Sequence, residues 1–251
     1  MLVMGILNVT PDSFADGGRH NEFDAAVKRG LEMIAEGVDI IDVGGESTRP
    51  GADRVSQEEE IARTIPVITE LAKHGATISI DTMRARTARA AVKAGAAMIN
   101  DVSGGLADEA MLQSAAELKV PYIAMHWRGQ SKDMNSKAIY SDVVIDVISE
   151  LQERITAALD AGIEVGNLII DPGLGFAKDA EHNWEIIDSI DSFVDLGYPV
   201  LVGASRKRFL GGDSPDEREQ ATIDLTKRLA TTGVWAVRVH SVKPHKEVLA
   251  Q

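Results

Sequence analysis

We predict that this chain folds as a single-domain (β/α)8 TIM barrel over residues 1–251, and three observations predict it. Short runs of β-branched residues alternate eight times with longer segments of helical spacing. The links are short, and no stretch has the composition of a domain linker. The length of 251 residues is usual for one such barrel. An open, doubly wound sheet is the alternative, but no G-x-G-x-x-G turn follows the first expected strand.

The expected strands are rich in Val, Ile and Leu, as in a parallel sheet that is covered on both faces. In one of them Val38, Ile40, Ile41 and Val43 form a short β-branched run that ends at Gly44. From such runs we expect strands at residues 2–9, 38–43, 77–80, 98–99, 122–125, 168–170, 199–203 and 233–239.

Apolar residues at spacings of three and four predict helices between these strands. Ser56 and Glu59 form a capping-box pattern ahead of one helix. Ser214 and Pro215 make a good N-cap and first position for another. We expect helices at residues 23–34, 56–71, around 91–92, 108–118, 142–161, 179–190 and 214–229, and a short one at the end. The polar segment 128–140 is expected to be a loop.

The composition excludes several classes of protein. The absence of cysteine excludes disulfides, a thiolate nucleophile and a thiolate zinc site, and suits the cytoplasm. The net charge of −13 argues against a nucleic-acid partner. No apolar run reaches the ~18 residues of a membrane span, and no signal peptide is visible. We therefore expect a cytoplasmic protein that binds neither nucleic acid nor membranes.

Polar residues follow every expected strand, and in a barrel of this class those strand ends converge on one site. A single residue of this kind is often a cap or a solvated side chain, but such groups at all eight ends are harder to dismiss. A packed role for the histidine after the fifth strand is as plausible as a functional one. The candidates are Asn8, Thr48, Asp81, Asn100, His126, Asp171, Lys207, Arg238 and His240.

The candidates separate by charge into two groups. Cations follow strands seven and eight, where such barrels often hold phosphate; these are Arg206, Lys207, Arg238 and His240. Asn8 could add an oxygen ligand to a magnesium ion that keeps most of its waters. Asp81, Asn100 and Asp171 offer two carboxylates and an amide, which suit a planar heterocycle rich in hydrogen-bond donors.

Motifs at these strand ends make the chain resemble the dihydropteroate synthase family of bacterial folate synthesis. The long motifs at the first two strand ends are the most specific, and MHWRG at the fifth is a fainter match. Besides MHWRG, the stretches that carry the resemblance are the two long motifs, MGILNVTPDSFADGG at 4–18 and DVGGESTRPG at 42–51, and then SIDT at 79–82, NDVSGG at 100–105, DPGLGFAK at 171–178, GASRKRFLG at 203–211 and RVH at 238–240.

The resemblance implies a transferase that joins 6-hydroxymethyl-7,8-dihydropterin diphosphate to 4-aminobenzoate and releases diphosphate. By that resemblance the pterin would be held by Asp81, Asn100, Asp171 and Lys207. Asn8 would bind Mg²⁺, and Thr48, Arg238 and His240 would contact the diphosphate. Pro50 and Ser205 would help to seat the aminobenzoate, Arg49 would also bind substrate, and loops 10–20 and 46–54 would close over the site.

The mechanism implied is a dissociative substitution, in which Asp81, Asp171, Lys207, Arg238 and His240 stabilise charge. The family is commonly a homodimer and a sulfonamide target. One departure is Ser241, which stands where the family usually has Asp and is expected to cap the last helix. Two alternatives stay open: a non-catalytic pterin-binding paralogue, and a folate-dependent methyltransferase of the same superfamily. The cluster of Lys207, Arg238 and His240 argues against the second.

Overall fold

A computed structural model describes residues 1–10, 18–46, 55–130 and 134–250 of the chain. Within them, the strands are β1 (Leu2–Asn8), β2 (Ile40–Gly44), β3 (Ile78–Asp81), β4 (Met98–Asp101), β5 (Tyr122–Met125), β6 (Leu168–Asp171), β7 (Leu201–Val202) and β8 (Ala236–Val239). The helices are α1 (Gly18–Ala35), α2 (Gln57–Lys73), α3 (Ala85–Ala94), α4 (Met111–Leu118), α5 (Val143–Asp160), α6 (Ala180–Asp188), α7 (Ile190–Val194), α8 (Arg218–Leu229) and α9 (Val242–Leu249).

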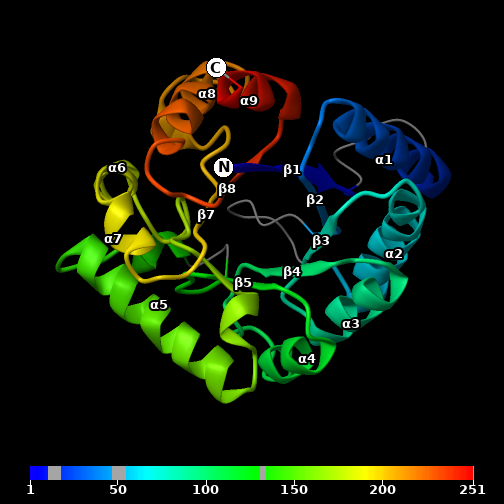
Figure 1. Cartoon of the computed structure of the whole chain (residues 1–251), viewed down its shortest axis with the longest axis horizontal. Helices are drawn as coiled ribbons and strands as arrows, with labels where there is room; N and C mark the ends of the chain where they lie inside the picture. The colour runs from blue at the N-terminus through cyan, green and yellow to red at the C-terminus, as the bar shows by residue number, and fades with distance from the viewer. Residues whose placement is uncertain (11–17, 47–54, 131–133, 251) are drawn as a thin grey trace.

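The eight strands form one parallel sheet that rolls up into a TIM barrel, as predicted. Each strand pairs with its neighbour in the chain from β1 to β6, and β8 lies between β1 and β7. The ring closes more weakly between β6 and β7, where a single bridge joins Ile170 to Val200. Figure 1 looks down this ring of strands, with α1 to α9 around it.

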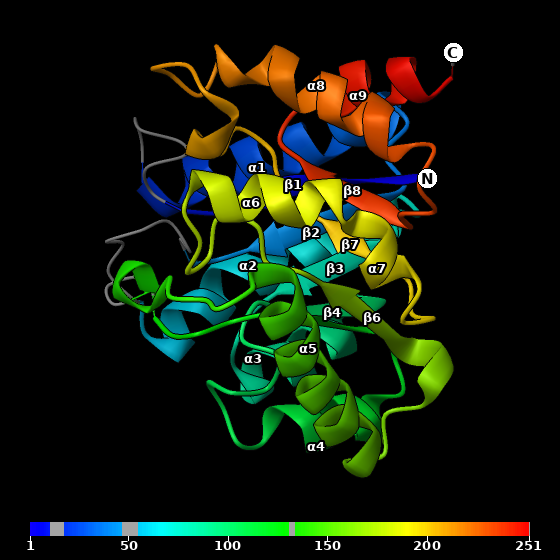
Figure 2. The same ribbon diagram turned by 90° about the vertical axis from the view of Figure 1, so that its left-hand side faces the viewer.

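The helices cover the outside of the barrel, and the main apolar core lies between them and the strands. Strand residues such as Ile41, Ile80 and Ile170 pack there against helix residues such as Leu71 and Leu151. In the side view of Figure 2 the helices flank the strands, and the two termini lie toward the same end of the barrel. In the described residues, no helix is long and apolar enough to cross a membrane.

Capping side chains fix several helix starts where the sequence predicts them. The hydroxyl of Ser56 accepts from the backbone N–H of Glu59 at 3.1 Å, at the start of α2. Asp142 accepts from the backbone N–H groups of Val144 and Ile145, both at 3.0 Å, and so caps α5. These bonds satisfy N–H groups that the first helical turn leaves unpaired.

The expected start of α8 was wrong. Ser214 caps a separate turn instead: its hydroxyl accepts from the N–H of Glu217 at 3.3 Å and donates to Glu217 Oε1 at 2.9 Å. That turn spans residues 215–217, and α8 begins only at Arg218. The segment 128–140, predicted to be a loop, also contains a short 3₁₀-helix at Met134–Lys137.

Candidate active site

The polar residues of the site lie inside the barrel, above a buried apolar layer. That layer takes one residue from each of seven strands: Met4, Ile40, Met98, Ile123, Ile169, Leu201 and Ala236. Strand side chains alternate between the two faces, so a residue two positions later faces the same interior. This rule directs Asp42, Asn100, Asp171 and Arg238 inward, toward the carboxyl ends of the strands.

Arg238 ties three strands together at this level. Its Nε donates to Asp42 Oδ2 and its Nη2 donates to Asp81 Oδ2, both at 2.6 Å. Asn100 Nδ2 donates to the same oxygen of Asp42 at 2.9 Å, which adds a fourth strand. Burial raises the pKa of Asp81 above its usual range, and the Arg238 cation opposes this.

Asp42 belongs to this cluster, although the sequence analysis did not single it out. It is fully buried, and among the described residues its Oδ1 has no hydrogen-bond partner. A buried carboxylate oxygen without a donor is costly, so this atom is suited to accept from a bound molecule. The available signal was a charged residue inside the apolar run from Ile40 to Val43, where alternation directs it inward.

Asp171 lies across the barrel at the end of β6. Its Oδ1 accepts from the backbone N–H of Gly173 at 2.7 Å, and its carbonyl accepts from the N–H of His126 at 2.9 Å. Burial raises its pKa, while the Gly173 N–H and the cations of Lys207 and Arg238 lower it. The carboxylate is therefore held in place by backbone and faces two cations.

Lys207 lies on the same rim as Asp171, as the sequence analysis requires. Its ammonium donates to the carbonyl of Leu174, three residues after Asp171. It also lies 4.8 Å from the centre of the Phe176 ring, a cation–π distance. Burial lowers the pKa of Lys207 to about 8, so it remains mainly cationic at pH 7.

Ser205 and His240 pair where β7 and β8 end. The Ser205 hydroxyl lies 3.0 Å from Nδ1 of His240 and accepts from the His240 backbone N–H at 3.2 Å. Ser205 is buried, and His240 is half-buried. The structure thus brings a predicted aminobenzoate residue and a predicted diphosphate residue into direct contact.

Ser241 does not cap α9, contrary to expectation. The N-cap position is Ser241, but its side chain makes no capping bond. Its hydroxyl instead accepts from Arg206 Nη2 at 2.7 Å, and Arg206 Nε also donates to Glu219 Oε2 at 2.6 Å. This bond has a charged donor, which makes it stronger than a bond between two neutral groups. Arg206 is thereby held by α8 and α9 in a left-handed conformation, with φ of 58°.

Asn8, the predicted magnesium ligand, lies at the end of β1 close to Asp81. A Cβ on Gly44 would lie 3.7 Å from Asn8 Oδ1 and 3.6 Å from Asp81 Oδ2, so both oxygens border one small space. Among the described residues, no group of three His, Asp or Glu side chains could hold a metal. Mg²⁺ commonly keeps several waters and binds substrate phosphates, which suits a single amide oxygen.

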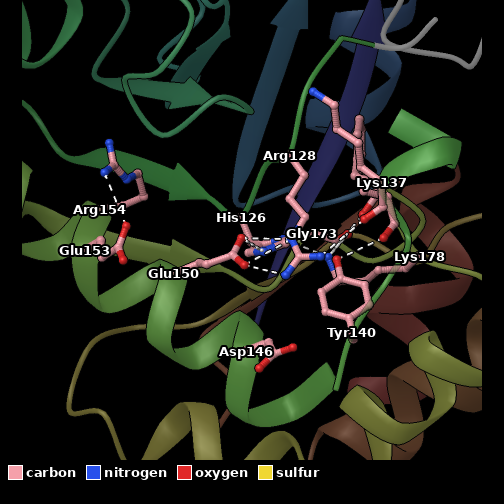
Figure 3. A network of polar contacts seen from close by, with 12 residues as sticks. His126, Arg128, Lys137, Tyr140, Asp146, Glu150, Glu153, Arg154, Gly173 and Lys178 are labelled. Atoms are coloured by element: carbon pink, nitrogen blue, oxygen red, sulfur yellow. Dashed lines mark hydrogen bonds and ion pairs between the residues drawn. The ribbon is translucent and has the colours of Figure 1, made fainter. Parts of the chain in front are cut away.

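His126 is packed within a buried network of polar side chains. It is 1% exposed, and its ring nitrogens lie 2.9 Å from Glu150 Oε2 and 2.9 Å from Lys178 Nζ. Lys178, in the DPGLGFAK motif, was not among the predicted site residues. Figure 3 shows this network of contacts, with the Arg128 guanidinium between Glu150 and the ring of Tyr140.

Three predicted substrate residues, Thr48, Arg49 and Pro50, lie outside the described residues, as do most residues of loops 10–20 and 46–54. Their proposed roles therefore stay predictions. The others, from Asn8 in β1 to His240 after β8, lie at the carboxyl ends of the strands. Among the described candidates, only His126 has its ring bonded to Glu150 and Lys178 and not to other candidate residues.

Comparisons with known proteins point to one family. The model of the family described as "Pterin binding enzyme" matches residues 4–240. The dihydropteroate synthase of Mycobacterium leprae is 49% identical over 257 residues, which cover 98% of this chain and 90% of that protein.

Solved structures agree with the sequence comparisons. The dihydropteroate synthase of Xanthomonas albilineans with 4-aminobenzoic acid superposes with a TM-score of 0.93 at 44% identity, covering 99% of this chain and 90% of that one. The complex of that organism's enzyme with 7,8-dihydropteroate gives a TM-score of 0.90 at 40% identity, covering 99% and 91%. The chain therefore belongs to the pterin-binding enzymes and, among them, to the dihydropteroate synthase family.

Proposed function

We propose that the chain condenses 6-hydroxymethyl-7,8-dihydropterin diphosphate with 4-aminobenzoate to give 7,8-dihydropteroate and diphosphate. The observation that carries this proposal is the mixed charge at one end of the barrel. Buried carboxylates on β2, β3 and β6 lie beside the cations of Arg238 and Lys207. This arrangement suits a substrate with a donor-rich ring at one end and an anionic leaving group at the other.

The pterin ring would bind to the acidic side of the site. Ring N–H and amino groups are donors, and the carboxylate of Asp171 and the buried Oδ1 of Asp42 are acceptors. Asn100 can both donate and accept, and Lys207 can donate to the ring oxygen or nitrogen. Because Asp42, Asn100 and Asp171 are buried and all four side chains are held by other bonds, they are preorganised for one orientation of the ring.

The diphosphate would leave toward Asn8, Arg238 and His240. Arg238 is held by two carboxylates, so its guanidinium is fixed before substrate binds. When bound at Asn8, Mg²⁺ would neutralise charge on the leaving diphosphate. Thr48 would add a hydroxyl, a role that remains a prediction.

The chemistry we propose is dissociative. The C–O bond to diphosphate breaks first, and positive charge spreads over the dihydropterin. The carboxylates of Asp81 and Asp171 stabilise that charge electrostatically. The neutral amine of 4-aminobenzoate then attacks the exocyclic carbon and loses a proton. Ser205, with Arg49 and Pro50, would seat the aminobenzoate, and loops 10–20 and 46–54 would exclude water. No protein nucleophile takes part.

The test is incubation of the purified chain with the pterin diphosphate, 4-aminobenzoate and magnesium. We expect 7,8-dihydropteroate and diphosphate in equal amounts. Pterin binding by calorimetry without product would instead identify a non-catalytic paralogue. Methyl transfer from a folate, the other alternative, is not favoured, because the curated relative compared above is a synthase.

Three further expectations belong to this proposal. Dependence of turnover on Mg²⁺ would be lost in Asn8→Ala if this residue holds the ion. A homodimer is expected from the family resemblance and is tested by light scattering after size exclusion. A cytoplasmic location, suggested by the absence of cysteine, is tested by cell fractionation.

A further inference from the structure

The loop after β6 has a left-handed backbone at three residues, one of which is not glycine. Gly173 and Gly175 have φ of 69° and 75°, and Ala177 has φ of 48° although it carries a side chain. The left-handed region costs a non-glycine residue on the order of 1–3 kcal/mol unless its surroundings impose it. At Gly173 a Cβ would lie 2.4 Å from the carbonyl oxygen of His126, so the loop also packs closely on the end of β5.

The side chain of Lys178 binds the backbone of this loop. Its Nζ donates to the carbonyls of Gly173 and Phe176, both at 3.1 Å, and lies 2.9 Å from Nδ1 of His126. An ammonium has three N–H donors, so these three acceptors satisfy it completely. Lys178 is only 8% exposed, and burial lowers its pKa to about 7. The carbonyls that it binds belong to the first and last residues of a turn in which the N–H of Phe176 donates to the carbonyl of Gly173 at 3.1 Å, and Ala177 follows directly.

A chain of contacts supports Lys178 from the surface. Because Lys178 donates to Nδ1 of His126, the proton of the neutral imidazole is on Nε2 and is donated to Glu150 at 2.9 Å. Burial and the Lys178 charge lower the pKa of His126 to about 4, so it stays neutral at pH 7. Arg128 Nε donates to both Glu150 oxygens at 3.0 Å, and the Tyr140 hydroxyl donates to the carbonyl of Ala177 at 2.9 Å (Figure 3).

The same loop also contacts Lys207 and Asp171, which we propose bind the pterin. The carbonyl of Leu174 and the ring of Phe176 both contact the Lys207 ammonium. The N–H of Gly173 is bonded to Asp171. Lys178 therefore binds the same loop whose residues contact Lys207 and Asp171.

We propose that Lys178 is a positioning residue for pterin binding: it fixes the loop of residues 173–177, and this loop in turn sets Lys207 and Asp171. His126 and Glu150 act one step further away, because they orient Lys178. The kinetic test of this inference rests on the proposed function. A second test, which measures pterin binding alone, does not depend on turnover.

The first test replaces Lys178 by Met, which keeps the length of the side chain and removes the three donors. We expect the KM for the pterin diphosphate to rise about 10- to 100-fold, the scale for a displaced binding group. The KM for 4-aminobenzoate should not change. The control is Lys246→Met, which removes a lysine bonded to Asp39 at 2.9 Å, next to the amino end of β2. It should change neither KM.

A double-mutant cycle tests whether Lys178 acts through Lys207. If it does, Lys178→Met should weaken pterin binding far less in a Lys207→Met background than in the wild type. Calorimetry with the pterin diphosphate measures this even without turnover. Failure of the wild type to make dihydropteroate would reject the proposed function. Equal losses in both backgrounds, or unchanged pterin affinity in Lys178→Met, would reject the positioning role.

Variants at His126 keep the proposal testable if Lys178→Met does not fold. The amide oxygen of Asn can replace Nδ1 as the acceptor for Lys178, whereas Leu cannot. We expect His126→Asn to retain most of the pterin affinity and His126→Leu to lose about as much as Lys178→Met. Equal pterin affinities in the two folded His126 variants would contradict the role of the Lys178 contact.

Discussion

Replacement of Arg238 by Met tests the electrostatic core of the site. The guanidinium lies 2.6 Å from both Asp42 and Asp81, which are 0% and 7% exposed. Without it, two neighbouring carboxylates stay buried with no cation bonded to them. Removal of one partner from a buried ion pair costs about 3–5 kcal/mol. For a chain of this size that lowers Tm by about 6–20 °C, at roughly 2–4 °C per kcal/mol.

The loss of stability in Arg238→Met should depend on pH with a defined sign. Without the cation, the pKa of Asp81 in the folded protein rises further above its unfolded value. When the pKa of a carboxyl is higher in the folded than in the unfolded protein, the folded protein binds the proton first, so it gains stability as pH falls through that pKa. The difference in free energy of unfolding between wild type and variant should therefore shrink from pH 8 toward pH 5.

Denaturant unfolding at several pH values measures this difference. Arg228→Met is the control, because Arg228 and Asp188 form an exposed ion pair at 2.7 Å that is expected to contribute at most about 1 kcal/mol. Asp42→Asn in the Arg238→Met background should restore part of the stability, since it removes one uncompensated charge. A small loss that does not vary with pH would refute the reasoning.

Three other predictions concern activity. Asp171→Asn, Lys207→Ala and Arg238→Ala should each lower the rate of dihydropteroate formation about 10²- to 10³-fold, the scale for one preorganised group; near-normal turnover in all three would remove the proposed site. Because burial lowers the pKa of Lys207 to about 8, kcat/KM for the pterin diphosphate should fall as pH rises through 8, and Lys207→Arg should move that fall to higher pH; an unmoved profile would assign it to another group. Sulfonamides should inhibit competitively with 4-aminobenzoate, and inhibition that added aminobenzoate does not relieve would contradict a shared site.

The alternation of strands with helices, and the polar residues at the strand ends, made most of the fold and site predictable. Polar residues lie at or just after the strand ends, and the fold class alone brings Asp81, Asn100, Asp171 and Arg238 to one end of a barrel. Asp42 was missed because it stands inside its strand and not after it. Attention to the face on which a charged residue falls, as well as its distance from the strand end, would have identified it.

Other features depend on contacts between distant segments. Ser241 has the right residue type and position for a cap, but the guanidinium of Arg206, 35 positions earlier, takes its hydroxyl. His126 and Lys178 are 52 positions apart, and neither shows from its neighbours that they meet. Local propensity sets which bonds a side chain can make, and tertiary packing decides which of them it makes.

The most direct measurement of the central claim is a crystal structure of this chain with a bound pterin. We predict that the ring lies inside the carboxyl end of the barrel, with its N–H and amino groups bonded to Asp171 and with Asn100 and Lys207 at its edge. A pterin bound elsewhere, with Asp171 and Lys207 making no contact with it, would contradict the claim.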